Sequence, residues 1–191
     1  MFISKNKYFL IIENTKDIDF RYIKKLNKYN VIYRNNLQNY NIDELLHFRS
    51  ICKSKKIKFY VANNRSLTVL LKADGVYISA SNYNLRFVQL KKQNYEIIGS
   101  AHNIKEFNIK ILQGCSEILF SRLFKTSYTQ KKSFLGIVKF NLLNQAYKKN
   151  LIPLGGIKMS NLNKLKLLKS DSFALMSEIK KKPAKIFNRL F

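Results

Sequence analysis

Short apolar runs alternate with longer amphipathic stretches along the whole chain. The apolar runs have the length and composition of buried strands, and the stretches between them carry apolar residues at helical spacing. The runs lie at residues 8–12, 31–33, 58–61, 75–78, 96–99, 117–120, 152–154 and 172–175. The helical stretches lie at residues 19–27, 42–54, 104–113 and 137–148. This alternation predicts parallel strands joined by helical crossovers.

Eight such units in 191 residues predict the α/β class, as a compact single-domain (β/α)8 TIM barrel over residues 1–191. A doubly wound open sheet fits the same alternation and is the alternative. Asn103 and Ser160 precede helical stretches and are the expected N-caps. The one long connection, residues 121–135, would lie at the C-terminal face, where barrel active sites are found.

Composition narrows the class of protein. The hydrophobic content of 46% indicates a globular chain, and no apolar run reaches the roughly 18 residues of a membrane-spanning helix. Cys52 and Cys115 are far apart and lack the spacing of metal ligands. We expect them to be buried, reduced thiols, and we therefore expect a cytoplasmic protein.

The net charge of +25 raises the question of nucleic-acid binding. The lysines, however, are scattered, and Asn, Ile, Tyr and Phe are also enriched, which is typical of an AT-rich coding sequence. Clusters at 53–56 and 180–182 fall at predicted helix ends, where cations suit the helix dipole. We predict a solvated lysine-rich surface that draws in anions, with a basic nucleic-acid-binding protein as the distant alternative.

Two strand-to-helix turns near the C-terminus point to phosphate. Gly155 and Gly156 follow one predicted strand, and Met176 and Ser177 follow the next. Glycines let the backbone approach a ligand closely, and helix N-termini offer N–H groups to anions. Adjacent turns of this kind predict a phosphate pocket; an ordinary tight turn at the glycines is the alternative.

Over roughly residues 8 to 180, the chain resembles the thiamine-phosphate synthase / TenI family, because six motifs occur in the order found in that family. The motifs are Val31-Ile32-Tyr33-Arg34, Lys72-Ala73-Asp74-Gly75-Val76-Tyr77-Ile78, Ile98-Gly99-Ser100-Ala101-His102-Asn103, Ile118-Leu119-Phe120-Ser121-Arg122-Leu123-Phe124-Lys125-Thr126, Gly155-Gly156-Ile157 and Leu175-Met176-Ser177-Glu178-Ile179. The resemblance implies a (β/α)8 barrel that acts in thiamine biosynthesis.

The synthase branch implies a transferase that joins a pyrimidine methyl diphosphate to a thiazole phosphate and releases diphosphate. Two aspartates of that branch help to hold Mg²⁺, and Asn63 and Asn82 stand at the aligned positions. Amides bring no negative charge, so the predicted metal site is degenerate. The resemblance further implies that the diphosphate meets the side chains of Arg34, Arg122, Lys125, Thr126, Lys131 and Lys132.

The TenI branch implies a thiazole tautomerase that needs no metal, or a non-catalytic phosphate-binding paralogue. There His102 would move the proton, because an imidazole titrates near neutral pH. The alternative is a loop histidine bonded to the neighbouring helix N-terminus. Ser100 is implied as a substrate-binding residue, whereas His47 and Asp74 are expected to be structural. The pattern leaves the oligomeric state open.

Overall fold

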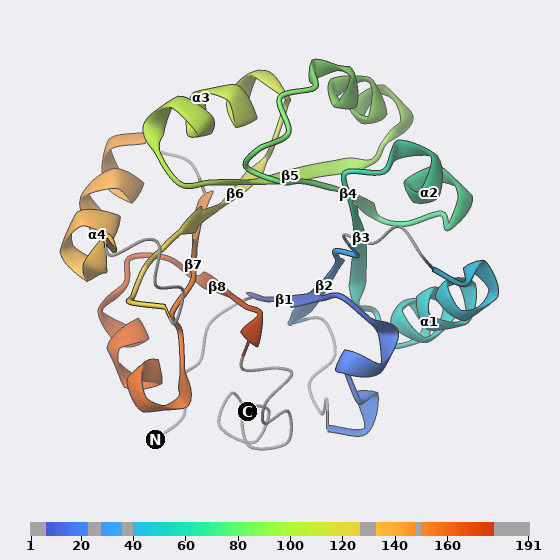
Figure 1. The fold of residues 1–191 in the computed structure, drawn as a ribbon, viewed down its shortest axis with the longest axis horizontal. Coiled ribbons are helices and arrows are strands. Elements are labelled where there is room, and N and C mark those ends of the chain that lie inside the picture. Colours follow the sequence, from blue (N-terminus) through green and yellow to red (C-terminus); the bar gives the residue numbers. More distant parts are fainter. Residues whose placement is uncertain (1–6, 23–27, 36–39, 127–132, 148–149, 178–191) are drawn as a thin grey trace.

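Eight parallel strands form a closed barrel with strand order β1 to β8, as the alternation predicts (Figure 1). The computed structural model describes residues 7–22, 28–35, 40–126, 133–147 and 150–177. The strands are β1 (Lys7–Ile12), β2 (Tyr29–Tyr33), β3 (Lys58–Ala62), β4 (Gly75–Ile78), β5 (Glu96–Ala101), β6 (Glu117–Ser121), β7 (Asn150–Leu154) and β8 (Ser172–Leu175). Pairing of β1 with β8 closes the barrel and excludes the open sheet.

The inside of the barrel is a packed core that lacks a channel. One buried side chain or two from each strand form it, because alternate residues of a strand point to opposite faces. The cluster comprises Phe9, Ile11, Ile32, Tyr60, Tyr77, Ile98, Leu119, Ile152 and Ala174. Below it, at the amino ends of the strands, Lys58 pairs with Glu96, and Lys7 Nζ lies 3.2 Å from Glu117 Oε1. The core and these ion pairs place any ligand site at the opposite end.

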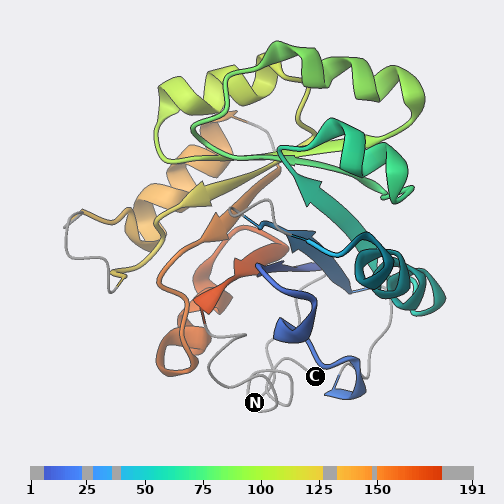
Figure 2. The ribbon, with the colours of Figure 1, turned by 45° about the vertical axis from the view of Figure 1, so that its right-hand side comes forward.

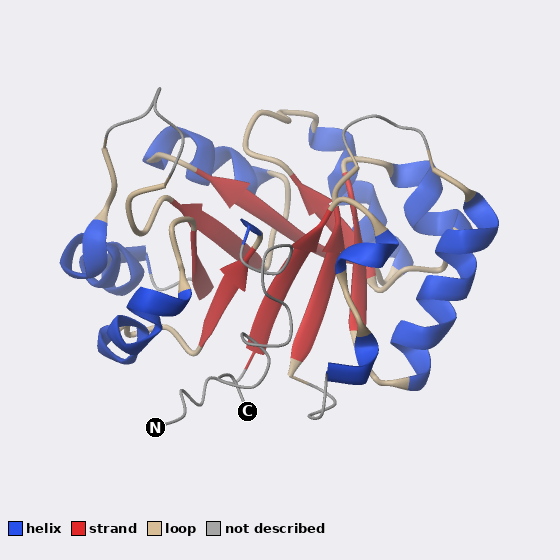
Figure 3. Cartoon of the chain, turned by 60° about the horizontal axis from the view of Figure 1, so that its bottom comes forward, coloured by secondary structure: helices blue, strands red, loops and turns tan. Residues whose placement is uncertain are grey.

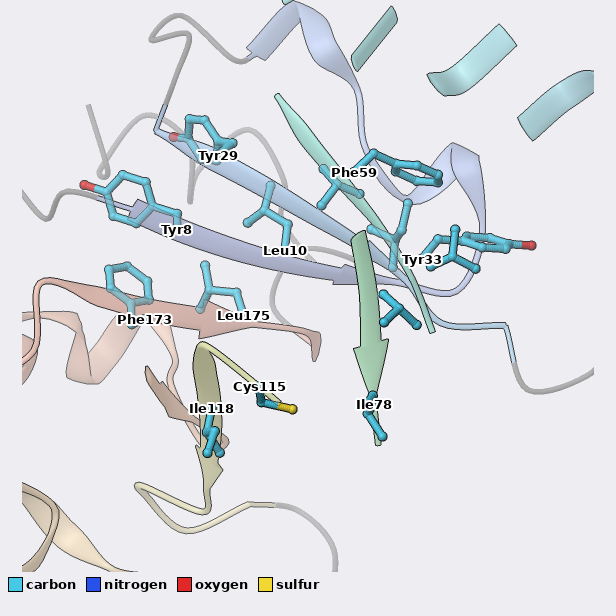
Figure 4. Packing of buried hydrophobic residues seen from close by; sticks show 14 of the residues in the cluster. Tyr8, Leu10, Tyr29, Tyr33, Phe59, Ile78, Cys115, Ile118, Phe173 and Leu175 are labelled. Atoms are coloured by element: carbon cyan, nitrogen blue, oxygen red, sulfur yellow. The ribbon is translucent and has the colours of Figure 1, made fainter. Parts of the chain in front are cut away.

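A second, larger core lies between the strands and the surrounding helices. Its aromatic part joins neighbouring strands: the Tyr8 ring centroid lies 5.3 Å from that of Tyr29 and 5.0 Å from that of Phe173 (Figure 4). Tyr8 is paired in register with both residues, so one buried ring stabilises the closure between β8, β1 and β2.

Helical segments surround the strands. Among the described residues, four of these segments are α-helices: α1 (Ile42–Ser54), α2 (Arg65–Leu70), α3 (Ile104–Leu112) and α4 (Gly136–Tyr147) (Figures 2 and 3). The connections after β1, β4 and β7 are 3₁₀ segments: η1 (Thr15–Asp17), η2 (Phe20–Tyr22), η3 (Leu85–Gln93) and η4 (Met159–Leu167). Of the eight expected helical segments, the seven between consecutive strands are therefore seen, three of these connections as 3₁₀ helix, and the chain after residue 177 lies outside the described residues. For the helix predicted at 19–27, the structure shows η2, and residues 23–27 lie outside the described residues.

Asparagine caps five helical segments, so part of the asparagine enrichment is structural. The side chains of Asn14, Asn41, Asn64, Asn84 and Asn103 each accept a hydrogen bond from the first turn of η1, α1, α2, η3 and α3 respectively. The prediction for Asn103 is thus confirmed. The prediction for Ser160 is wrong: η4 begins at Met159, and the Asn161 side chain accepts from Lys158 N–H at 2.8 Å.

Two structural expectations hold, for the cysteines and for Asp74. Cys52 and Cys115 are buried free thiols, and burial raises the pKa of each to about 12, which keeps them protonated. Asp74 is structural: its carboxylate accepts the Phe59 N–H at 2.7 Å and pairs with Arg49 at 3.1 Å. In the described part of the chain, no helix has the length and apolar character needed to cross a membrane.

Candidate functional site

The residues singled out from the sequence gather at the carboxyl ends of the strands. Arg34 follows β2, Asn63 follows β3, His102 follows β5, Arg122 follows β6, and Gly155 follows β7. In a parallel barrel these positions share one rim, at the end opposite the Lys–Glu pairs. The fold therefore brings the predicted site residues to one mouth, in two groups.

Arg34 is the charged centre of the first group. Its Nε atom is buried and has no hydrogen-bond partner among the described residues. Burial raises the pKa of the Tyr77 hydroxyl, and the hydrogen bond with Ser100 and the positive charge of Arg34 act against that rise. A buried donor without a partner costs free energy, and Arg34 lines a pocket, so its guanidinium is a candidate for binding an anionic ligand.

A pocket of about 220 Å³ opens beside Arg34, between the ends of β2 and β3. Its wall combines aromatic, amide and aliphatic side chains: Tyr33, Arg34, Asn35, Tyr40, Val61, Ala62, Asn63, Asn64 and Leu67. Ser100 does not line it. Instead, Ser100 is buried, and its Oγ accepts a hydrogen bond of 2.8 Å from the Tyr77 hydroxyl.

Asn63 and Asn82 lie together, as the resemblance implies, but they bond to each other. Asn82 Nδ2 donates to Asn63 Oδ1 at 3.1 Å, and the Ser79 N–H donates to the same oxygen at 2.9 Å. Asn63 Nδ2 in turn donates to Ser79 Oγ at 2.9 Å. We call this arrangement of Asn63, Ser79 and Asn82 the amide lock.

The amide lock does not fit Mg²⁺. The Asn63 oxygen already accepts two hydrogen bonds, and the neighbouring Asn64 oxygen accepts the Leu67 N–H at 2.9 Å to cap α2. No group of three or more His, Cys, Asp or Glu side chains suited to a metal occurs among the described residues. Hard divalent cations favour carboxylate oxygens, and the amide lock and the lining of the adjoining pocket contain amides and an arginine instead.

Arg122 and the glycines of the β7 turn form the second group. Arg122 Nη1 donates to Thr126 Oγ1 at 3.1 Å, and a Cβ at Gly155 would lie 3.1 Å from Arg122 Cγ. A Cβ at Gly156 would lie 2.4 Å from the Phe124 carbonyl oxygen. Both glycines have positive φ, +91° and +69°. Packing against the loop after β6 thus requires glycine here and holds the Arg122 cation beside the turn.

The turns after β7 and β8 add backbone donors to this part of the rim. The N–H groups of Gly156, Ile157, Met176 and Ser177 donate to no group of the residues that the structure describes. β7 and β8 are paired neighbours, so the turns that follow them are adjacent. Met176 packs against the inner core and Ser177 is exposed. Unpaired N–H groups next to an arginine suit an anion.

His102 lies on the rim, but its side chain is turned to the adjacent helix. Its Nδ1 lies 3.1 Å from Glu106 Oε2, and its backbone N–H donates to the same oxygen at 2.7 Å. This is the helix-terminus arrangement that we considered as the alternative to a catalytic role. Lys125 is exposed. Lys131 and Lys132, and the cluster at 180–182, lie outside the described residues.

Sequence reasoning missed one set of polar residues at the rim. Lys110 and Gln113 of the α3 region are fully buried and bond the backbone of the loop that carries Asn82. The signal was weak, because a lysine in an amphipathic helix is normally exposed. A glycine in the facing strand, Gly99, was the only local sign of a side chain that needs space.

Comparisons with known proteins agree with the resemblance. The family model described as "Thiamine monophosphate synthase" matches residues 30–179. A thiamine-phosphate synthase from Prochlorococcus marinus is 28% identical over 142 residues, which cover 74% of this chain and 41% of that protein. One from Clostridioides difficile is 26% identical over 137 residues, which cover 71% and 65% respectively. The match thus spans less than two thirds of these relatives.

Solved structures confirm the fold. A thiamine phosphate pyrophosphorylase from Pyrococcus furiosus superposes with a TM-score of 0.72 over 98% of both chains, at 16% identity. KGPDC from Streptococcus mutans gives a TM-score of 0.68 over 97% of this chain and 95% of that chain, at 9% identity. At these identities the likeness concerns the barrel alone.

Proposed function

Since the chain belongs to the thiamine monophosphate synthase family, we propose that it binds a thiazole phosphate at the β7 and β8 turns and joins it to a pyrimidine methyl diphosphate. The proposal is carried by the N–H groups of Gly156, Ile157, Met176 and Ser177, which bond to no other described residue, together with Arg122, which lies against Gly155. A phosphate monoester is the anion that such a set of donors suits.

In the proposed reaction, the C–O bond between the pyrimidine methylene and the diphosphate breaks, and the diphosphate leaves with the electron pair. The thiazole nitrogen then forms the C–N bond to the electron-poor methylene. Negative charge grows on the departing diphosphate, so donors that face it lower the barrier. Arg34, with its buried unpartnered Nε, and Arg122 are the cations that we assign to this task.

Mg²⁺ would supply additional positive charge at the diphosphate in this family, but the amide lock gives it no carboxylate ligand. We therefore derive no step through a metal. The arginines and the pocket of Tyr33, Tyr40 and Asn64 remain to bind and orient the pyrimidine half.

The test is formation of thiamine phosphate from the two substrates, with excess Mg²⁺ and with a chelator. We expect the wild type to form product under both conditions. Arg122→Gln removes one donor that stabilises negative charge, so we expect its turnover to be about 10²-fold slower. Arg86→Gln is the matched control, because Arg86 is exposed on η3. Equal turnover of the two variants would contradict the role of Arg122, and absence of product would contradict the transferase.

One observation favours a second candidate, a TenI-like thiazole tautomerase. Glu106 holds His102 Nδ1 at 3.1 Å, which leaves Nε2 for a proton transfer that requires no metal. This activity predicts isomerisation of a thiazole phosphate alone, abolished in His102→Gln. Binding of the thiazole phosphate without either reaction would identify a non-catalytic paralogue.

A further inference from the structure

The loop after β4, residues 79–84, is held from behind by a lysine that solvent does not reach. The Lys110 side chain has 0% exposure, and its Nζ donates to the Asn82 carbonyl oxygen at 2.7 Å and to Gln113 Oε1 at 2.8 Å. None of the ion pairs among the described residues includes Lys110. Lysines are rarely buried without a paired carboxylate, so the burial of Lys110 requires an explanation.

Gln113 completes the grip on the same loop. Its Nε2 donates to the Asn82 carbonyl at 2.9 Å and to the Asn84 carbonyl at 3.0 Å. The ring centroid of Tyr83, between these two residues, lies 5.9 Å from the Lys110 ammonium. Two side chains from the end of α3 therefore fix three consecutive loop residues; we call Lys110 and Gln113 the α3 clamp.

The barrel wall provides the space for the clamp. A Cβ at Gly99 of β5 would lie 2.9 Å from Lys110 Cδ and 2.8 Å from Cys115 Sγ, so only glycine leaves room for the lysine stem. Burial lowers the pKa of Lys110, and the nearby Cys115 and Glu106 partly oppose that effect. The ammonium group of Lys110 loses its hydration in this position, and the hydrogen bonds to the two carbonyl oxygens compensate for that loss.

The clamp acts on the mouth through Asn82. The clamp holds the backbone carbonyl of this residue, while its side chain donates to Asn63 Oδ1 in the amide lock. Asn63 lines the pocket beside Arg34. We propose that Lys110 is a positioning residue, which holds the loop after β4 so that Asn82 keeps Asn63 in place at the pocket without a metal ion between them. Its importance for catalysis rests on the proposed function.

Hydrogen exchange tests this role without a substrate. In Lys110→Met, which keeps the length of the stem, we expect amide exchange in residues 79–84 to rise at least about tenfold, because loop opening no longer breaks the clamp. Exchange in β1, β2 and β6 should stay as in the wild type. Lys105→Met, on the exposed face of the same helix, should change none of these rates. If exchange rises equally throughout the barrel, or stays unchanged in 79–84, the proposal is wrong.

Binding of inorganic pyrophosphate separates this proposal from the proposed function. We expect Lys110→Met to weaken it about tenfold relative to Lys105→Met. If the wild type binds no pyrophosphate, the proposed diphosphate role of the pocket fails, and exchange alone still decides the role of Lys110. Should Lys110→Met not fold, Gln113→Glu keeps an acceptor for Lys110 but removes both donors to the loop. It should give the same local rise in exchange, and an unchanged rate would refute the clamp.

Discussion

At the scale of single residues, the mouth of this barrel replaces charge by hydrogen bonds. A pair of carboxylates repel each other and hold together only through a cation between them, whereas a pair of amides can donate and accept. Asn82 and Asn63 form such an amide pair, with 3.1 Å between Asn82 Nδ2 and Asn63 Oδ1. The positive charge at the rim then belongs to the protein itself, through Arg34 and Arg122.

This difference predicts the response to a metal ion. The wild type should bind Mn²⁺, a spectroscopic probe for Mg²⁺, no better than millimolar. The double variant Asn63→Asp, Asn82→Asp should gain a site at least about tenfold tighter, because two carboxylates now converge. Titration followed by electron paramagnetic resonance measures both. The matched control is Asn108→Asp, at an exposed position of α3 outside the amide lock. Tight Mn²⁺ binding by the wild type would refute the assignment.

Residue identity alone predicted which side chains gather at the rim but not what they do there. Arg34 and Arg122 directly follow predicted strands, so their place on the rim follows from the alternation of strands and helices. The bonding of Ser100 to Tyr77 inside the barrel depends on a side-chain contact between neighbouring strands, which no local pattern encodes. The same holds for Lys110, whose burial depends on the missing side chain of Gly99.

At the scale of elements, the turn after β7 and the loop after β6 behave as one unit. The Phe124 N–H donates to the Gly155 carbonyl at 3.0 Å, and the Leu123 N–H donates to the Leu154 carbonyl at 2.9 Å. Gly156 in turn lies against the Phe124 carbonyl. Arg122 is therefore oriented toward the turn by backbone contacts, before any ligand binds.

Gly156→Ala should disrupt this unit. The new Cβ would meet the Phe124 oxygen at 2.4 Å in a backbone with φ of +69°, so we expect a loss of at least about 2 kcal/mol in the free energy of unfolding and weaker phosphate binding. Gly136→Ala is the control, with φ of +74° and no atom within 4 Å of the added Cβ. It should cost about 1 kcal/mol. Urea unfolding measures both; equal losses would mean that the contact with Phe124 is unimportant.

The elements themselves were largely predictable. The strands follow from continuous apolar runs, and α1 coincides with the predicted stretch at 42–54. The differences are in the crossovers: after β1, Asp19 accepts the Arg21 N–H at 2.9 Å and forms a local turn, and the described residues there form the 3₁₀ segments η1 and η2. At η4 the capping side chain, Asn161, lies inside the segment and bonds back to Lys158. Such local bonds compete with regular helix and leave the apolar spacing unchanged.

At the scale of the whole molecule, the barrel has a sealed lower end and a polar upper end. The lower end holds Lys7, Lys58, Glu96 and Glu117 in ion pairs, and the Tyr60 hydroxyl donates to Glu96 Oε2 at 2.6 Å. The surplus of positive charge elsewhere suits anionic substrates at the open end.

The lower end predicts a dependence of stability on pH. Burial tends to raise the pKa of Glu96, but the hydrogen bonds from Lys58 and Tyr60 outweigh it and leave the pKa below its usual value. Glu96 therefore contributes stability above about pH 4.3, the pKa of an unfolded glutamate, and this contribution is lost as the pH falls through the lower folded pKa.

Glu96→Gln should thus lower the free energy of unfolding by less than about 1 kcal/mol at pH 7, since the ion pair is partly exposed, and flatten its decline below pH 4.3. Urea unfolding between pH 3 and 7 measures both effects. The matched control is Asp171→Asn, an exposed carboxyl at the same end. A decline as steep in Glu96→Gln as in the wild type would contradict the role of Glu96.

The connection between β6 and α4 is tied at its base: the Leu135 N–H donates to the Arg122 carbonyl at 2.8 Å, and the Gly136 N–H donates to the Leu123 carbonyl at 2.9 Å. When the two ends of a loop are bonded to each other, a change in loop length has little effect on the rest of the protein. Each doubling of the length costs only about 0.6 kcal/mol in free energy. Between Thr126 and Ser133, evolution and protein engineers can therefore exchange or lengthen sequence to alter what the mouth admits, while the barrel and Arg122 stay as they are.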